Sequence, residues 1–230
     1  TLRAHPGIGI VSLDADGPEG DVLDRDGLTG EAAVAEGPGA GAEPSLGARA
    51  RPEPGSGPTV PPNATFPAAA YEACRTADQA RAVRAFESLA SPGNAVVVEA
   101  DRGRGKSSAA GLAAGALALA GADVLVTAPA VRNAAEVFAR AGELVGADDG
   151  EGDGAAASGT PRVETRSGGR VRSLPPAEAA ELPGDPDVAI VDEAAALPVR
   201  LLEGFLDERV AVAFCTTVHG YEGACRGFAI

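Results

Sequence analysis

The chain has 230 residues, of which 45% are hydrophobic, and a net charge of −14 from 19 basic and 33 acidic residues. This length and apolar content suffice for one large domain, with a core rich in alanine and poor in aromatic residues. One interpretation of the acidic balance is a repelled or absent nucleic-acid partner, because binding to phosphates usually requires a basic surface. Because the acids are scattered, we favour a second interpretation, a solvated acidic surface suited to a salt-rich cytoplasm.

Three further features bound the class of protein. The sequence contains no methionine, which predicts a fragment or a processed product. The cysteines at 74, 215 and 225 form no CxxC pair, and their odd number argues against a disulfide framework. No signal peptide is visible and no apolar run approaches the length of a membrane span. We therefore expect a cytoplasmic protein with no membrane partner.

Residues 1–65 are predicted to be the tail of a preceding domain plus a linker. Residues 8–13 alternate in hydrophobicity as a strand does, whereas glycine and proline dominate residues 37–62 and prevent a packed core. Aspartates at 14, 16 and 21 invite a calcium-loop interpretation, but Pro18 stands where a ligand is needed. We interpret them as turn residues.

Helices and strands are predicted to alternate in residues 66–230. A helix begins at Thr76 and carries Val83, Phe86 and Leu89 on one side. Strands are expected at 96–100, 123–127, 171–174, 188–191 and 210–216, and further helices at 107–120, 131–145, 177–182 and 199–207. The acidic, glycine-rich residues 147–161 are expected to be a disordered insertion. This order predicts an α/β domain with a parallel sheet covered on both faces.

The motif Ala-Asp-Arg-Gly-Arg-Gly-Lys-Ser at 100–107 lies between a predicted strand and a predicted helix. Backbone N–H groups of such a loop surround phosphates, Lys106 supplies positive charge, and the Ser107 hydroxyl can ligate Mg²⁺. Lys106 is the sole lysine of the sequence, which argues that arginine does not serve there. Ala100 replaces the usual first glycine, which is tolerable where φ is negative. The alternative is an ordinary glycine turn into a helix.

A second motif is the apolar strand 188–191 followed by Asp192 and Glu193. In a phosphate-loop fold, such a strand end delivers an aspartate to Mg²⁺, and a neighbouring glutamate orients the attacking water. By itself an Asp-Glu pair is also a common turn. Its position about ninety residues after the phosphate loop favours the catalytic interpretation.

The sequence closes with Cys215-Thr-Thr-Val-His-Gly-Tyr-Glu-Gly-Ala-Cys-Arg-Gly-Phe228. Paired hydroxyls at a strand end, here Thr216 and Thr217, are where a helicase-like motor senses the γ-phosphate. Arg226 fits a phosphate-contacting finger. The plainer alternatives are strand-end capping and a surface ion pair. We expect His219 to be a hydrogen-bonding loop residue, because no nucleophile pairs with it in sequence.

Gln79 has two interpretations that local sequence does not separate. Thr76-x-x-Gln79 fits a helix capping box. Helicases also use a glutamine upstream of the phosphate loop to recognise the adenine edge.

Taken together, three strings resemble the tRNA(Met) cytidine acetyltransferase family. They are the phosphate loop at 100–107, Val-Asp-Glu-Ala-Ala-Ala-Leu-Pro at 191–198, and Thr-Thr-Val-His-Gly-Tyr-Glu-Gly at 216–223 followed by Arg-Gly-Phe at 226–228. The resemblance covers about residues 70–230 and implies a RecD-like helicase core with a phosphate-loop NTPase fold. This sequence has Ala224-Cys225 where the family usually has Thr-Gly. Without that glycine, the backbone before Arg226 is more restricted.

The resemblance also implies which residues bind ATP. They are Gln79, Arg226 and the loop residues Asp101, Arg102, Gly103, Arg104, Gly105, Lys106, Ser107 and Ser108. We expect catalysis from Lys106, Asp192 and Glu193, and Mg²⁺ ligands from Ser107 and Asp192. Thr217 and Arg226 are expected to report the nucleotide state.

A parent enzyme of this family would use acetyl-CoA and ATP to make N4-acetylcytidine in elongator tRNA(Met) or another structured RNA. No acetyl-CoA loop is visible in the sequence, so we expect the acetyltransferase domain to be missing and this chain alone not to acetylate cytidine. Two alternatives stay open: another phosphate-loop motor, such as a DNA helicase, and a nucleotide-binding module without turnover.

Overall fold

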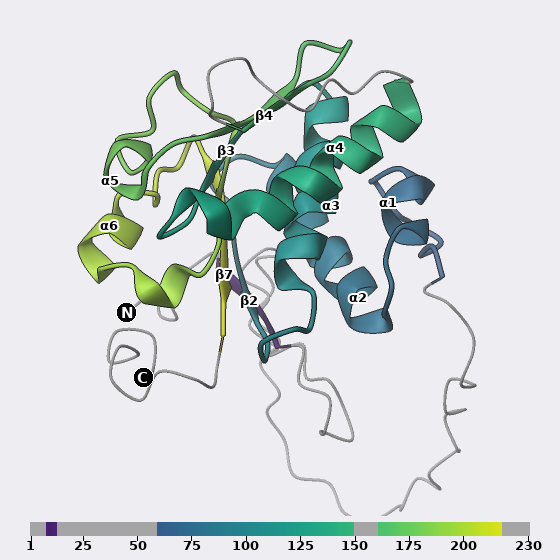
Figure 1. Ribbon diagram of the computed structural model, residues 1–230, viewed down its shortest axis with the longest axis horizontal. Helices are drawn as coiled ribbons and strands as arrows, with labels where there is room; N and C mark the ends of the chain where they lie inside the picture. The colour runs from purple at the N-terminus through teal and green to yellow at the C-terminus, as the bar shows by residue number, and fades with distance from the viewer. Residues whose placement is uncertain (1–7, 13–58, 150–160, 218–230) are drawn as a thin grey trace, which may run out of the picture.

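A computed structural model describes residues 8–12, 59–149 and 161–217 (Figure 1). Within these residues seven strands form one sheet in the order β1-β2-β7-β6-β3-β5-β4. Neighbouring strands are parallel, except that β4 runs antiparallel to β5. The strands are β1 (Ile8–Ser12), β2 (Ala95–Glu99), β3 (Asp123–Thr127), β4 (Arg162–Glu164), β5 (Arg170–Ser173), β6 (Val188–Val191) and β7 (Ala211–Thr216). The predicted parallel α/β sheet is confirmed.

Helices cover both faces of this sheet, as predicted. The described helices are α1 (Ala68–Glu72), α2 (Ala77–Phe86), α3 (Lys106–Leu119), α4 (Ala135–Asp149), α5 (Pro176–Ala179) and α6 (Val199–Glu203). Short 3-10 helices occur at η2 (Glu87–Ala90), η3 (Val131–Ala134) and η4 (Ala194–Ala196). In Figure 1, α1 to α4 lie together, while α5 and α6 lie apart from them. None of these helices is long and apolar enough to cross a membrane.

The core consists of two apolar clusters, one on each face of the sheet. Successive strand residues point to opposite faces, so the central strands β2, β3, β6 and β7 each contribute to both clusters. In β2, Val96 and Val98 pack with α1 to α4, whereas Ala95 and Val97 pack with Leu202 and Phe205 on the other side. This arrangement explains why the central strands are apolar throughout rather than alternating.

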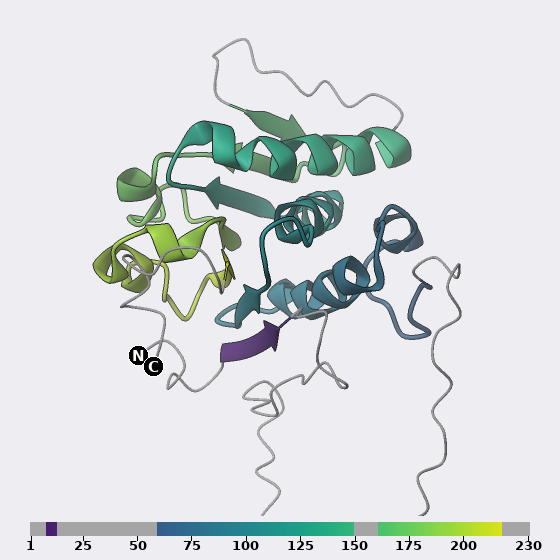
Figure 2. The same cartoon turned by 60° about the horizontal axis from the view of Figure 1, so that its bottom comes forward.

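Several boundaries differ from the sequence predictions. The strand predicted at 8–13 forms as β1 and pairs with β2, so it lies at the edge of this same sheet (Figure 2). The expected disordered insertion at 147–161 begins too early, because α4 continues to Asp149. The sequence analysis missed α1 and β4, which are only five and three residues long. Residues 13–58 and 150–160 lie outside the described residues, and the boundary near residue 65 stays a proposal.

A buried carboxylate anchors the chain entering this domain to the end of α2. The Glu87 carboxylate accepts hydrogen bonds from the backbone N–H groups of Thr65 and Phe66 and from the Tyr71 hydroxyl, and it pairs with Arg84. Burial favours a raised pKa for Glu87, but these hydrogen bonds and the Arg84 charge outweigh it and lower the pKa. The network fixes η2 against residues 65–71, and with it the helix that carries Gln79.

Two glycines allow α3 and α4 to pack at unusually short range. A Cβ atom on Gly111 would lie 2.4 Å from the Val137 carbonyl oxygen, and one on Gly115 would lie 3.1 Å from that of Ala141. Both contacts are with backbone, which cannot swing aside. The helix that follows the phosphate loop, α3, therefore packs closely against α4 because these two positions carry no side chain.

We predict that Gly111→Ala lowers the free energy of unfolding by about 1–3 kcal/mol, the usual cost of overpacking a core. Gly142→Ala on α4 is the matched control, because its Cβ would meet only Val163 Cγ2 at 3.9 Å. The helix propensity of alanine should make that variant neutral or up to about 1 kcal/mol more stable. Urea unfolding measures both, and equal effects of the two substitutions would contradict the packing account.

Candidate nucleotide-binding site

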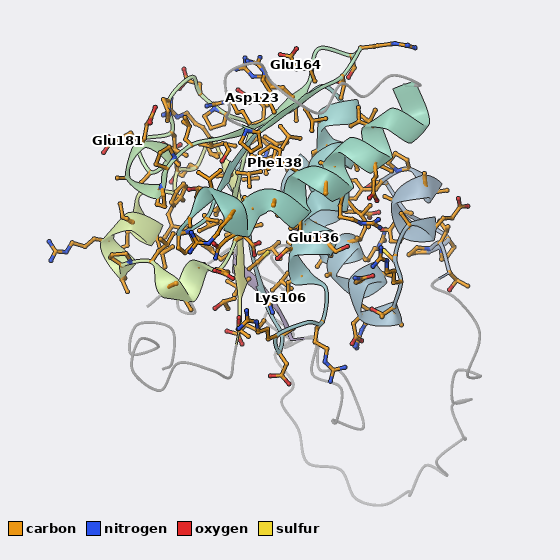
Figure 3. The ribbon with its side chains drawn as sticks, in the orientation of Figure 1. Lys106, Asp123, Glu136, Phe138, Glu164 and Glu181 are labelled. Atoms are coloured by element: carbon orange, nitrogen blue, oxygen red, sulfur yellow. The ribbon has the colours of Figure 1, made fainter. Side chains whose placement is uncertain are left out.

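Three parallel strands bring the predicted motifs to one edge of the sheet. β7 pairs with β2 on one side, with Glu99 opposite Thr216, and with β6 on the other, with Val191 opposite Phe214. The phosphate loop follows β2, the two threonines end β7, and Asp192 follows β6. All three therefore lie at the carboxyl edge of the sheet, where open α/β folds bind ligands. Lys106 marks this edge in Figure 3.

The loop adopts the compact turn that its glycines permit. The Arg104 N–H donates to the Asp101 carbonyl oxygen at 3.3 Å, and Gly103 and Gly105 have φ values of +84° and +83°. Gly105 directly precedes α3, which begins at Lys106. Ala100 is buried and its φ is not positive, so the condition for alanine at the first loop position is met.

The Lys106 ammonium is buried against the start of its own loop. Its side chain is 9% exposed, and Nζ donates to the carbonyl oxygens of Ala100 at 2.7 Å and Asp101 at 3.0 Å. Burial lowers the pKa of Lys106, while the nearby Asp192, Asp101 and Glu193 carboxylates act in the opposite direction. A buried cation at a helix N-terminus favours an anionic ligand.

Asp192 carries a buried oxygen that finds no partner within the described residues. The residue is 1% exposed; Oδ1 accepts the Glu193 N–H at 3.0 Å, and Oδ2 accepts no hydrogen bond. Burial raises the pKa of this carboxyl, against the opposing effects of the Ser107 hydroxyl and the Lys106 charge. An unpaired buried carboxylate oxygen next to a serine hydroxyl is a donor set that suits Mg²⁺, which keeps other positions for water and phosphate.

Glu193 is exposed and held in an unusual backbone conformation. Its φ is +51°, in the left-handed region that non-glycine residues rarely occupy. Its Oε2 accepts a hydrogen bond from the Asn133 side-chain amide, which lies 60 residues earlier in the sequence. The sequence analysis missed Asn133, because nothing in the local pattern of η3 marks it.

The two threonines at the end of β7 lie in different environments. Thr216 is 3% exposed and its hydroxyl oxygen has no hydrogen-bond partner among the described residues, whereas Thr217 is half-buried. Cys215, the residue before Thr216, is fully buried. Burial raises the pKa of its thiol well above the usual range, and the Asp192 charge acts in the same direction. This thiol is therefore neutral, in keeping with a packing role.

Gln79 takes part in capping α2, as one of its two interpretations predicts, and its side chain lies beside the phosphate loop. Thr76 Oγ1 accepts the Gln79 N–H at 3.2 Å, which caps α2, and Gln79 Oε1 accepts the Arg75 N–H at 2.6 Å. The same side chain lies against the phosphate loop, because a Cβ atom on Gly105 would fall 2.0 Å from Gln79 Nε2. Capping thus orients the glutamine toward the loop.

The remaining predicted residues are placed as follows. Arg102 is exposed, Asp101, Arg104 and Ser107 are half-buried, and Ser108 is buried on α3. Arg226 and His219 lie outside the described residues, as does Cys225. The structure therefore brings Gln79, the loop, Asp192, Glu193 and the β7 threonines to one edge.

Fold and site together define a phosphate-loop nucleotide-binding domain of the α/β class. A match to a protein-family model assigns the domain more specifically within this class. The model described as RNA cytidine acetyltransferase NAT10/TcmA, helicase domain, matches residues 97–230. The chain belongs to this family, and the match lies in the family's helicase domain.

Curated relatives agree with this assignment. A tRNA(Met) cytidine acetyltransferase TmcA from Haloferax volcanii is 52% identical over 235 residues, which cover 100% of this chain and 27% of that protein. The protein of the same name from Haloarcula marismortui is 54% identical over 230 residues, again 100% of this chain and 27% of the relative. The chain thus spans about a quarter of the length of these relatives.

Two phage terminases of low sequence identity are among the solved structures that align with part of this chain. The large terminase ATPase domain of Thermus phage P74-26 aligns with a TM-score of 0.42 and 20% identity, covering 57% of this chain and 62% of that one. The HK97 bacteriophage large terminase has a TM-score of 0.42 and 15% identity, covering 60% and 32%.

We predict that Gly105→Ala destabilises the domain by about 1–3 kcal/mol more than Gly103→Ala does. Both substitutions place an alanine at positive φ, which lowers the free energy of unfolding. Only Gly105→Ala also displaces the buried Gln79 side chain and breaks its hydrogen bond with the Arg75 N–H. No atom lies within 4 Å of a Cβ on Gly103. Thermal and urea unfolding of each variant, alone and with Gln79→Ala, measures the difference. A difference that persists without the glutamine side chain would refute this contact.

Proposed function

We propose that this chain binds and hydrolyses ATP with Mg²⁺, as the helicase-like module of an RNA cytidine N4-acetyltransferase. The remainder of that enzyme would acetylate structured RNA, such as elongator tRNA(Met), with acetyl-CoA. One observation carries the proposal: the buried Lys106 ammonium, the unpaired Asp192 carboxylate oxygen and the exposed Glu193 carboxylate come together at one edge of the sheet. A purely structural turn needs none of these.

Nucleotide binding would begin at the loop. Residues 101–105 lead into the N-terminus of α3, whose first backbone N–H groups favour anions. Lys106 would exchange its two carbonyl contacts for phosphate oxygens, which are better partners for a buried ammonium. Gln79 would contribute from the adjoining helix, and Arg226 from the segment after β7.

Ser107 and Asp192 would hold Mg²⁺, because they offer a hydroxyl and a buried carboxylate oxygen side by side. When bound, the ion neutralises charge on the phosphoryl oxygens. Asp192 gains from this arrangement, since its otherwise unpaired Oδ2 acquires a partner and the burial penalty on its ionised form is offset.

Glu193 would orient the attacking water. It is the exposed member of the acidic pair, so water reaches its carboxylate while Asp192 stays enclosed. Thr217 and Arg226 would report the nucleotide state to the domains beyond this chain. ATP turnover would then drive RNA remodelling or the placement of the target cytidine, whose exocyclic amine must be accessible for acetylation.

The acidic charge of this chain indicates that it is not the main RNA-binding part of the parent enzyme. A net charge of −14 opposes strong RNA binding by this module alone, and salt shortens the range of that repulsion to about 3 Å at 1 M. RNA contacts would therefore come mainly from other parts of the parent enzyme.

We predict that Lys106→Ala weakens ATP binding at least tenfold, and that Lys106→Arg also impairs it, because a guanidinium does not fit a site shaped for a compact ammonium. Glu193→Gln should spare binding and reduce turnover by about a hundredfold or more. Arg209→Ala is the matched control, since Arg209 pairs with Asp207 at the opposite edge of the sheet. Calorimetry and phosphate release measure both quantities in dilute and multi-molar KCl.

Three results would count against this function. Turnover by Glu193→Gln equal to that of the unsubstituted chain would refute the role of the glutamate. Binding without turnover, even with RNA present, would select the non-hydrolysing alternative. Failure of a folded chain to bind ATP at either salt would refute the nucleotide site itself, with circular dichroism reporting folding.

A further inference from the structure

Glu193 is the exposed carboxylate of the site, and an exposed glutamate side chain samples several rotamers unless something holds it. Its backbone is fixed at a φ of +51°. The side chain is fixed separately, by the hydrogen bond from Asn133 Nδ2 to Glu193 Oε2. No other hydrogen bond to this carboxylate is found within residues 59–149 and 161–217.

Asn133 is well placed to act as a rigid support. β3 and β6 are neighbours with Thr127 opposite Val191, and the Asp192 N–H donates to the Thr127 carbonyl oxygen at 2.9 Å. The segment after β3 therefore leaves the sheet beside the Asp-Glu pair. Within η3 the Asn133 N–H donates to the Ala130 carbonyl oxygen at 2.8 Å, and the next residue, Ala134, is fully buried.

We propose that Asn133 is a positioning residue for ATP hydrolysis, which anchors Oε2 of Glu193 so that Oε1 is aimed at the attacking water. A carboxylate has two oxygens, and an amide that engages one of them leaves the other able to accept from water. The inference rests on the proposed function, in which Glu193 orients water. It adds a residue from a segment that none of the sequence motifs includes.

This arrangement also joins the site to the outer surface. Val131 is 53% exposed and Arg132 is exposed, two positions and one position before Asn133 in the same short helix. Movement of η3 would displace the amide from Glu193 without touching the phosphate loop. Turnover and nucleotide affinity would then respond separately.

The test is steady-state ATP hydrolysis with ATP binding measured in parallel. We expect Asn133→Ala to lower kcat by about ten- to a hundredfold, the range for losing a hydrogen bond to a charged group, with ATP affinity within about twofold. Asn133→Asp, which has the same shape but repels Glu193, should lower kcat at least as much. Arg132→Ala, from the same helix, is the control and should keep the original kcat.

A double-variant cycle tests whether Asn133 acts on kcat through Glu193. In a Glu193→Gln background, Asn133→Ala should cause little further loss of kcat, because the two residues act as a unit. A full additional loss, an unchanged kcat or a raised kcat in Asn133→Ala would each overturn the positioning role. Loss of ATP affinity equal to the loss of kcat would overturn it also, by indicating general disruption of the site.

A measurement without nucleotide separates this inference from the proposed function. Glu193→Gln should shift the NMR signals of the Asn133 side-chain amide protons in the folded chain, and no shift would refute the contact. If the unsubstituted chain hydrolyses ATP but Asn133→Ala does so equally well, the inference alone fails. If the unsubstituted chain hydrolyses no ATP, the proposed function fails, and the inference fails with it.

Discussion

The burial of one ammonium group at the carboxyl edge of a parallel sheet is the constraint on which the site depends. Lys106 is 9% exposed and lies among Asp101, Asp192, Glu193 and Cys215. A buried cation is costly unless anionic or carbonyl oxygens surround it. The register of β2, β7 and β6 supplies those groups, because the three neighbouring strands end within two residues of one another along the sheet. Loop, hydroxyls and carboxylates thus form one electrostatic unit.

The site is held in place by packing that carries no charge. Gly111 and Gly115 let α3 approach α4 closely, and Gly105 leaves room for the Gln79 side chain beside the loop. On the face of the sheet opposite α3, Leu202 and Phe205 cover β6, which Asp192 follows, and β7, which ends at Thr216. Because both faces are apolar and filled, the polar groups are displaced to the strand ends, where an anion can reach them.

Much of the fold and site follows from local sequence. Apolar runs bounded by polar residues, glycine or proline predict β2, β3, β6 and β7 almost to the residue, and Gly-Lys-Ser predicts the loop. Elements of three to five residues, such as α1 and β4, are not predicted because they are too short to show a hydrophobic periodicity. The Asn133–Glu193 contact escapes for another reason: it depends on the pairing of β3 with β6, which sequence spacing does not encode. The position of Asp192 directly after β6 follows from the sequence, whereas its unpaired oxygen does not.

The most direct test of the central claim is the Mg²⁺ dependence of ATP affinity. Calorimetric titration of this chain in MgCl₂ and in EDTA, alongside Asp192→Asn, probes Lys106, Ser107 and Asp192 as one unit. We expect Mg²⁺ to tighten ATP binding by the unsubstituted chain and Asp192→Asn to remove most of this gain. Equal affinities with and without Mg²⁺ in the folded, unsubstituted chain would contradict it.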